Sequence, residues 1–272
     1  VKMLVIMKGA GDLATGVAVR LWRAGLKVVV SELPQPLVVR RSVSFGQAIV
    51  SGEVVVEGIR ARSVQDGTDT LRVLQILSKG QVPVLVDPDG QAALSLHPTV
   101  IVDARLLKQP PEPLKHQAKL YIGLGTGFTA GQNCHVVVET NRGPRLGRVI
   151  WQGSASEDTG IPEHVSGEST RRVLRAPADG LLVAHAEIGM HIAKNQLIAS
   201  VGAQQILAPF KGVLRGLIQP GVEVHTGQKI GDLDPRDDPS LCQFVSDKAL
   251  AVAGGVLEAI LSIQELRPLL WK

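Results

Sequence analysis

A glycine-rich turn near the start of the chain has the residue types of an anion-binding loop. Gly9, Gly11 and Ala14 follow the apolar run 3–7 and precede apolar residues at helical spacing. In dinucleotide-binding proteins such glycines allow a tight turn, and a pyrophosphate approaches the N-terminus of the following helix. The motif predicts a nucleotide or another phosphate-bearing ligand here, and a purely structural turn is the alternative.

Charged residues around this turn leave both interpretations open. Asp12 could face the ligand, or it could cap the helix. Lys8 could balance that charge, and Glu32 could accept hydrogen bonds from ribose hydroxyls or simply end a strand. An arginine pair could neutralise a phosphate or lie on a solvated helix face. The candidate binding residues of this region are Lys8, Gly9, Gly11, Asp12, Ala14, Thr15, Glu32, Arg40 and Arg41.

A second candidate site lies in the segment 123–131, which contains four glycines in nine residues. Exposed backbone N–H groups in such a loop can form a nest for an anion, whereas a closely packed loop is the alternative. The planar guanidinium of Arg142 matches a phosphate or carboxylate. The candidate residues of this second region are Gly125, Gly127, Glu139 and Arg142.

Several motifs together resemble the YqeB family. They are the segments 8–18, 32–41, 123–131, 139–143, 146–148 and 247–258. Members are described as accessory proteins of selenium-dependent molybdenum hydroxylase systems. The resemblance implies an accessory or maturation protein that binds a nucleotide or molybdopterin-type phosphate ligand at the first glycine turn. Its expected partners are the hydroxylase or its maturation proteins, and a homo-oligomer is an open alternative.

Two other functions compete with this one. The first is an NAD(P)-dependent oxidoreductase that uses the same turn, and the second is a non-catalytic scaffold. No Tyr-x-x-x-Lys pattern surrounds Tyr121, which is the only tyrosine, and no catalytic residue is identified. Cys134 could carry sulfur as a persulfide, or it could be a small buried residue. The seven histidines show neither His-x-x-x-His nor His-x-His spacing, so no metal site is predicted.

The composition restricts the partners and the compartment. Lys and Arg total 29 against 25 Asp and Glu, and aromatic residues are 3% of the chain. Nucleic acid is therefore not an expected partner. No stretch has the roughly 18 to 20 apolar residues of a membrane span, and the start lacks a signal-peptide pattern. With only two cysteines, these features predict a cytoplasmic protein without a membrane partner.

Apolar runs indicate the elements that must position these residues. In the first 108 residues, they predict an open α/β sheet with strands at 3–7, 28–30, 53–62, 82–86 and 100–102, and helices at 13–24, 37–49 and 70–77. Asp69 is a candidate cap of the last helix. The proline-rich segment 109–113 predicts a hinge or linker. Strands are expected at 121–124, 135–139 and 146–151, a loop at 152–172, and a buried helix at 249–263.

An internal repeat marks the C-terminal half. The segment 176–180 recurs 32 residues later at 208–212, and further positions match in the same register. The repeat resembles the biotinyl/lipoyl-type barrel-sandwich fold, but its turn at 201–205 has no lysine, so neither biotin nor lipoate is expected. The predicted fold is an α/β protein with a Rossmann-like domain at 1–108, a glycine-rich connecting region at 109–171, a barrel-sandwich module at 172–235 and a helical segment at 236–272.

Overall fold

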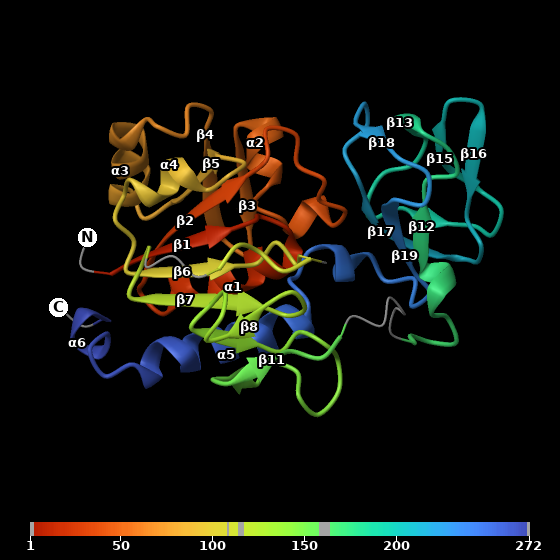
Figure 1. Cartoon of the computed structure of the whole chain (residues 1–272). Coiled ribbons are helices and arrows are strands. Elements are labelled where there is room, and N and C mark those ends of the chain that lie inside the picture. Colours follow the sequence, from red (N-terminus) through yellow and green to blue (C-terminus); the bar gives the residue numbers. More distant parts are fainter. Residues whose placement is uncertain (1–2, 108, 114–116, 158–163, 271–272) are drawn as a thin grey trace. The chain divides into compact units, whose positions relative to one another are not determined.

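The computed structural model describes residues 3–107, 109–113, 117–157 and 164–270. They form two compact units (Figure 1). The first, which we call the sheet unit, consists of Val1–Pro36, Phe45–Asp158 and Val245–Lys272. The second, the repeat unit, consists of Leu37–Ser44 and Thr159–Phe244. Both units are therefore discontinuous in sequence. They differ from the four consecutive segments that the sequence predicts.

A large mixed sheet is the centre of the sheet unit. Its nine strands lie in the order β10-β9-β7-β6-β1-β2-β5-β4-β3. The strands from β9 to β4 run parallel, whereas β10 and β3 at the edges are antiparallel to their neighbours. The strands are β1 (Leu4–Lys8), β2 (Lys27–Glu32), β3 (Glu53–Val56), β4 (Ile59–Val64), β5 (Val82–Val86), β6 (Val100–Asp103), β7 (Leu120–Leu124), β9 (Val136–Val138) and β10 (Val149–Ile150).

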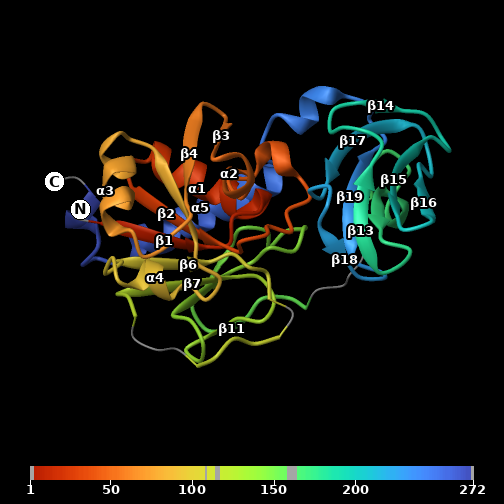
Figure 2. The same cartoon turned by 90° about the horizontal axis from the view of Figure 1, so that it is seen from above.

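Helices cover both faces of this sheet (Figure 2). On one face, the strand residues Ile6 and Val137 share a core with Val73 of α3 (Thr70–Ser78) and Ala93 of α4 (Gln91–Leu94). On the other face, a Cβ on Gly255 of α5 (Asp247–Ser262) would lie 2.8 Å from Val138. Helix α1 (Asp12–Arg23) packs against α5 so closely that a Cβ on Gly16 would lie 2.5 Å from the Cβ of Ala249. The short helices α2 (Gln47–Ser51) and α6 (Arg267–Leu270) complete the unit.

The predicted fold class, a Rossmann-like domain followed by a barrel-sandwich module and a terminal helix, is wrong. The structure is a mixed α/β protein with one large mixed sheet, several smaller antiparallel sheets and a small helix at its end. The sheet does not end near residue 108, because β7, β9 and β10 extend it and α5 packs against it. The two strands β8 (Thr129–Ala130) and β11 (Gly153–Ser154) form a separate small sheet.

Two four-stranded antiparallel sheets build the repeat unit, in the orders β12-β19-β17-β14 and β16-β15-β13-β18. Each half of the repeat lends its short strand to the other half, because β14 pairs with β17 and β18 pairs with β13. Leu182, Leu214 and Leu233 contribute to the common core. The strands are β12 (Val173–Arg175), β13 (Gly180–Ala184), β14 (His191–Ile192), β15 (Leu197–Val201), β16 (Gln204–Leu207), β17 (Gly212–Leu217), β18 (Glu223–Val224) and β19 (Lys229–Asp234).

Two local predictions are wrong for identifiable reasons. The expected helix at 37–49 does not form, because residues 37–44 belong to the repeat unit, where Val39 packs against Gly216. Only a 3₁₀ turn at Arg41–Val43 and the short α2 remain. The expected strand at 53–62 is a hairpin whose turn residues Glu57 and Gly58 both have positive φ, as a type I′ turn requires.

The predictions for other elements are confirmed. Strand β5 has the predicted bounds, and Asp69 caps α3 by accepting a hydrogen bond from the Arg72 N–H at 2.9 Å. Helix α5 covers nearly all of the segment expected to be a buried helix, and its Val and Ala side chains form the buried face. Within the described residues, no helix is both long enough and apolar enough to span a membrane.

Candidate functional site

The chain order of the parallel strands reverses at β1, which lies between β2 and β6. In parallel α/β sheets, ligands bind outside the carboxyl ends of the strands at such a switch point. Lys8 is the last residue of β1 and pairs in register with Asp103, the last residue of β6. A ligand is therefore expected near the side chains of Lys8 and Asp103 at these two strand ends.

Asp103 is fully buried and is the centre of a polar cluster. Arg105 binds both of its carboxylate oxygens, with Nε 2.9 Å from Oδ1 and Nη2 2.6 Å from Oδ2. The Tyr121 hydroxyl, at the next strand, donates to Oδ2 at 2.9 Å. Burial, together with the charge of Asp103, raises the pKa of Tyr121 far above its usual range, so the phenol stays a hydrogen-bond donor.

Lys8 lies beside this cluster but does not take part in it. Its residue is 7% exposed, and its Nζ lies 5.7 Å from the ring centroid of Tyr121. Within the described part of the chain, we find no hydrogen bond or ion pair of the Lys8 ammonium. Burial lowers the pKa of Lys8, and the nearby Arg105 lowers it further, although Asp103 and Asp87 act in the opposite direction. The Lys8 amine is thus a buried cation without a directly bonded anion.

Neighbouring backbone fixes the position of the lysine. The Gly90 residue before α4 has φ +67°, and a Cβ there would lie 2.9 Å from Cε of Lys8. Asp87 accepts hydrogen bonds from the N–H groups of Ala92 and Ala93, at 3.2 and 2.9 Å, and so holds α4 in place. Gly90 therefore leaves room for the aliphatic part of Lys8.

A pocket of about 670 Å³ lies over these strand ends. Lys8, Arg105 and Tyr121 line it, together with Gln91 of α4 and Asn133. The proline-rich residues 109–113, which the sequence predicts to be a hinge or linker, also line this pocket. Of the candidate binding residues, only Lys8 lines it, so the pocket and the glycine turn share a single residue.

The first glycine turn is held together by its own hydrogen bonds. Gly9 has φ +92°, and its N–H donates to the Ser31 carbonyl at 2.9 Å. The Ala10 N–H donates to one carboxylate oxygen of Glu32 at 2.8 Å, and the Leu33 N–H donates to the other at 2.8 Å. Burial raises the pKa of Glu32, although these hydrogen bonds oppose the shift. Glu32 therefore stabilises the turn. The Gly9 and Ala10 N–H groups of the turn bond to the protein itself and do not face a ligand.

The start of α1 differs from the expected arrangement. Gly11 occupies the N-cap position and Asp12 is the first helical residue, so the interpretation of Asp12 as the cap is wrong. Ala14 is buried in the helix. The buried Thr15 hydroxyl donates to the Ala10 carbonyl at 3.3 Å and accepts from the Phe45 N–H at 2.8 Å. Thr15 thereby ties the turn to the point where the chain re-enters the sheet unit.

The arginine pair belongs to the repeat unit. Arg40 Nη2 donates to the carbonyls of Leu241 and Phe244, at 3.3 and 3.1 Å. Arg41 Nε donates to the Leu217 carbonyl at 2.7 Å, and its Nη1 donates to Gln219 at 2.9 Å. Both side chains therefore anchor the segment 37–44 within that unit.

The second glycine-rich segment is closely packed. A Cβ on Gly123 would lie 2.2 Å from the Phe128 ring, and one on Gly125 would lie 2.3 Å from the Thr140 hydroxyl. A Cβ on Gly127 would lie 2.8 Å from the Leu107 carbonyl. These contacts favour the structural interpretation of this loop over an anion nest.

Glu139 and Arg142 also have protein partners. Glu139 Oε1 accepts from the N–H groups of Thr140 and Asn141, and Oε2 accepts from Ser156, each at 2.8 Å. Burial alone would raise the pKa of Glu139, but these hydrogen bonds hold it below its usual value. The Arg142 fork binds Asp247 at the start of α5 with two distances of 2.7 Å. These contacts account for both residues without a ligand.

Cys134 is fully buried, and burial raises its pKa to about 11. A thiolate is therefore disfavoured at neutral pH, which argues against the sulfur-carrier interpretation. Among the described residues, no group of three or more His, Cys, Asp or Glu side chains could hold a metal ion.

Sequence analysis missed Asp103, Arg105 and, as a site residue, Tyr121. They lie far from Lys8 in the chain and meet it only because β1, β6 and β7 are neighbours in the sheet. The available signal was Asp103 itself, a carboxylate at the end of a wholly apolar strand, where burial requires a partner.

The fold and pocket define a two-unit α/β protein with a pocket at the switch point of its sheet, lined by the charged residues Lys8, Arg105, Asp89 and Glu112. No known family model matches the chain. The chain is 45% identical over 260 residues to a protein named Uncharacterized protein YqeB from Escherichia coli (strain K12). The match covers 96% of this chain and 48% of the relative, so the chain spans about half the length of this curated relative. The similarity supports the resemblance to the YqeB family.

Solved structures provide only remote likenesses. One is an aspartoacylase family protein from Mesorhizobium loti, 11% identical with a TM-score of 0.28, matched over 85% of this chain and 84% of that one. Another is a succinylglutamate desuccinylase from Silicibacter sp. TM1040, 12% identical with a TM-score of 0.25, over the same shares of the two chains. Scores this low carry no argument about the function of the present chain.

Proposed function

We propose that the sheet unit binds a small phosphate-bearing ligand, a nucleotide or a molybdopterin-type compound, in the pocket over β1, β6 and β7. The observation that carries this proposal is the buried Lys8 ammonium at the pocket wall. A buried cation is unfavourable unless an anion compensates it, and a phosphate group would supply that charge. Arg105 lines the same pocket, and its side chain remains 35% exposed although Asp103 holds its fork.

We further propose that the protein that binds this ligand is an accessory or maturation protein of a molybdenum hydroxylase. In the YqeB family this hydroxylase is described as selenium-dependent. The support is the set of sequence motifs and the 45% identity to YqeB. The partners would be the hydroxylase or its maturation proteins, in the cytoplasm. The role concerns the whole protein, of which this chain corresponds to about half in the relative.

The NAD(P)-dependent oxidoreductase has weaker support than this proposal. A dinucleotide fingerprint needs free N–H groups at the glycine turn and a free acidic residue for the ribose. Here the Ala10 N–H and the Glu32 carboxylate bind each other at 2.8 Å. A non-catalytic scaffold remains the alternative if no ligand binds.

A panel of compounds tests the proposal by their effect on the melting temperature. It contains ADP, ATP, NAD and NADP, together with molybdopterin forms, each with native protein, Lys8→Met and the exposed control Lys79→Met. We expect at least one phosphate-bearing compound to raise the melting temperature of native protein and of Lys79→Met, because it binds only the folded state. The shift should be lost in Lys8→Met. An equal shift in all three proteins would contradict the proposed site.

A further inference from the structure

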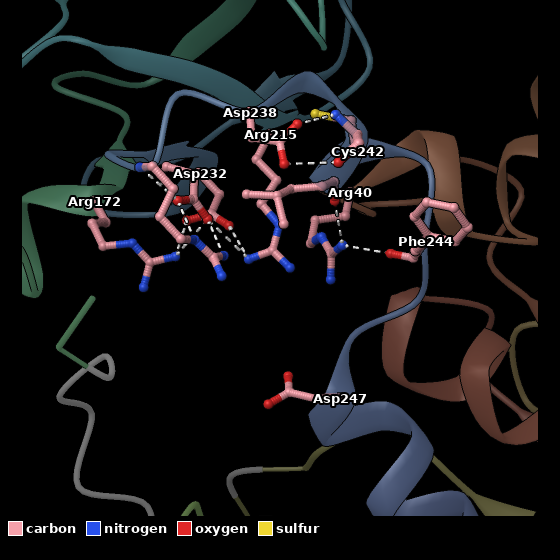
Figure 3. A network of polar contacts seen from close by, with 12 residues as sticks. Arg40, Arg172, Arg215, Asp232, Asp238, Cys242, Phe244 and Asp247 are labelled. Atoms are coloured by element: carbon pink, nitrogen blue, oxygen red, sulfur yellow. Dashed lines mark hydrogen bonds and ion pairs between the residues drawn. The ribbon is translucent and has the colours of Figure 1, made fainter. Parts of the chain in front are cut away.

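The outer face of one sheet in the repeat unit carries a cluster of charged side chains (Figure 3). Leu214, Leu233 and Leu174 of β17, β19 and β12 point into the core. Because successive side chains of a strand alternate between faces, Asp232 and Asp234 of β19 lie on the opposite face. Arg215 lies at a β-bulge of β17, and its guanidinium approaches both of these carboxylates. Arg172, directly before β12, and Arg236, directly after β19, join them.

Asp234 is the carboxylate around which the arginines gather. Arg236 binds it tightly, with Nη2 2.6 Å from Oδ2 and Nε 2.9 Å from Oδ1. The same Oδ2 lies 3.6 Å from Arg172 and 3.4 Å from Arg215. Charge-assisted hydrogen bonds are normally about 2.7–2.9 Å long. The Asp234 carboxylate therefore bonds closely to Arg236, and its contacts with Arg172 and Arg215 are weaker.

Arg215 makes only long contacts with the aspartates of this cluster. Its side chain is only 14% exposed, and its contact with Asp232 is 3.9 Å long. Its Nε is buried and has no hydrogen-bond partner in the described part of the chain. Burial lowers the pKa of Arg215, and the positive charges of Arg40 and Arg236 lower it further, against the opposing effect of the two aspartates. The unpartnered Nε and the long contacts with both aspartates therefore leave Arg215 with donor capacity for a further anion.

We propose that this face of the repeat unit is a binding site for a tetrahedral oxyanion, the phosphate or sulfate group of a ligand or the free ion, with Arg215 as its central contact. A guanidinium group offers its N–H donors in a planar fork that matches the oxygens of a phosphate. Arg172 precedes β12 and Arg215 lies in β17, so they can contact different oxygens of one tetrahedral group. The site is separate from the pocket of the sheet unit and does not depend on its function.

Titration calorimetry with inorganic phosphate, in sodium chloride of matched ionic strength, tests this site. Native protein is compared with Arg215→Gln and with Lys211→Gln, whose lysine belongs to the same unit and is 74% exposed. We expect native protein and Lys211→Gln to bind alike, and Arg215→Gln to bind about tenfold more weakly or worse, because charged hydrogen bonds are lost. Lys8→Met should retain this phosphate binding.

Further arms of the titration identify the ligand. A phosphate monoester that binds more tightly than inorganic phosphate would indicate a larger ligand, and equal binding would indicate the free ion. Both results support the site. Binding of succinate as tight as that of phosphate would overturn the tetrahedral class. If Arg215→Gln fails to fold, Arg215→Lys keeps the charge but loses the fork and should also bind more weakly.

Three results overturn the proposal. They are the absence of phosphate binding by native protein, unchanged phosphate affinity in a folded Arg215 variant, and loss of phosphate binding in Lys8→Met. The last result would assign the anion to the sheet-unit pocket and would leave the proposed function intact. Conversely, phosphate binding that depends on Arg215 would stand even if no compound of the panel bound at Lys8.

Discussion

Asp103 determines which side chains remain for a ligand at the switch point of the sheet. Its two carboxylate oxygens are taken by Arg105 and by the Tyr121 hydroxyl. The negative charge closest to Lys8 in the strand register is therefore already bound to a guanidinium. In this arrangement Lys8 is the positioned cation, and the Asp103 cluster is the support that shapes the pocket wall beside it.

The titration of Tyr121 tests this description of the cluster at the residue scale. Because Tyr121 is the only tyrosine, the near-ultraviolet absorbance of tyrosinate reports on it alone. Burial and the adjacent Asp103 carboxylate raise its pKa, so folded protein should form no tyrosinate near the usual pKa of about 10. Unfolding in urea should restore ordinary titration. Ionisation of Tyr121 near pH 10 in protein that is still folded would refute the contact with Asp103.

The sequence made part of the site predictable at this scale. Lys8 was found because it precedes the glycine turn, although it lines the pocket over β1 and β6 and the turn does not. Arg105 and Tyr121 gave no local signal, because their roles depend on strand neighbours that only the sheet order defines. Asp12, Glu32 and Glu139 have residue types suited to ligand binding, but hydrogen bonding to the backbone is equally typical of them.

Close packing decides the role of the loop between β7 and β9 at the scale of elements. Gly123 faces the ring of Phe128, whereas Gly131 has nothing within 4 Å of the position of a Cβ. Gly123→Ala should therefore destabilise the protein by about 3 kcal/mol or more through overpacking. Gly131→Ala, at φ +84°, should cost only about 1 kcal/mol of backbone strain.

Urea unfolding of the two variants measures this difference. The Gly131→Ala substitution should leave the binding of the phosphate-bearing ligand unchanged, as expected for a structural loop. A Gly123→Ala protein as stable as Gly131→Ala would show that the loop is loosely packed. It would also revive the anion nest as an explanation of its glycines.

The turn after β9 depends on the charge of Glu139. Its carboxylate has a lowered pKa because three N–H groups donate to it. A lowered pKa in the folded state means that this contribution to stability is present above the ordinary pKa, about 4.3, and is lost as the pH falls through the folded value. Glu139→Gln should lower the free energy of unfolding at neutral pH by about 2 kcal/mol and flatten its fall in acid.

Urea unfolding between neutral and acidic pH measures this effect, with Glu258→Gln on the exposed side of α5 as control. Identical acid profiles for native protein and Glu139→Gln would show that the carboxylate does not hold the turn. An acid profile altered equally by Glu258→Gln would instead indicate a general charge effect.

Element prediction succeeded where local pattern and tertiary context agree. The run Val82–Val86 is buried in the middle of the sheet and was predicted with its bounds. The segment 37–49 failed because its helical spacing of apolar residues serves two units, with Val39 packed in one and Phe45 buried in the other. Periodicity reports that a side chain is buried but does not report which core contains it.

At the scale of the whole molecule, segments of the sheet unit and of the repeat unit alternate along the chain. The segments 1–36, 45–158 and 245–272 must associate to complete one sheet and its helices. A local reading of sequence divides such a chain into consecutive domains and ends the sheet too early. The 32-residue repeat was predictable because both of its halves are continuous in sequence.

We propose that Lys8 is a buried cation whose missing anion is the phosphate of the ligand. Nuclear magnetic resonance of the lysine side chains, with Lys8 assigned from its missing signal in Lys8→Arg, measures the pKa of this amine directly. Without ligand the pKa should lie below the ordinary value for lysine, as burial requires. With the panel compound that most raises the melting temperature, the pKa should rise, because a bound anion favours the charged amine. A Lys8 pKa that stays the same when this compound is bound would contradict the account.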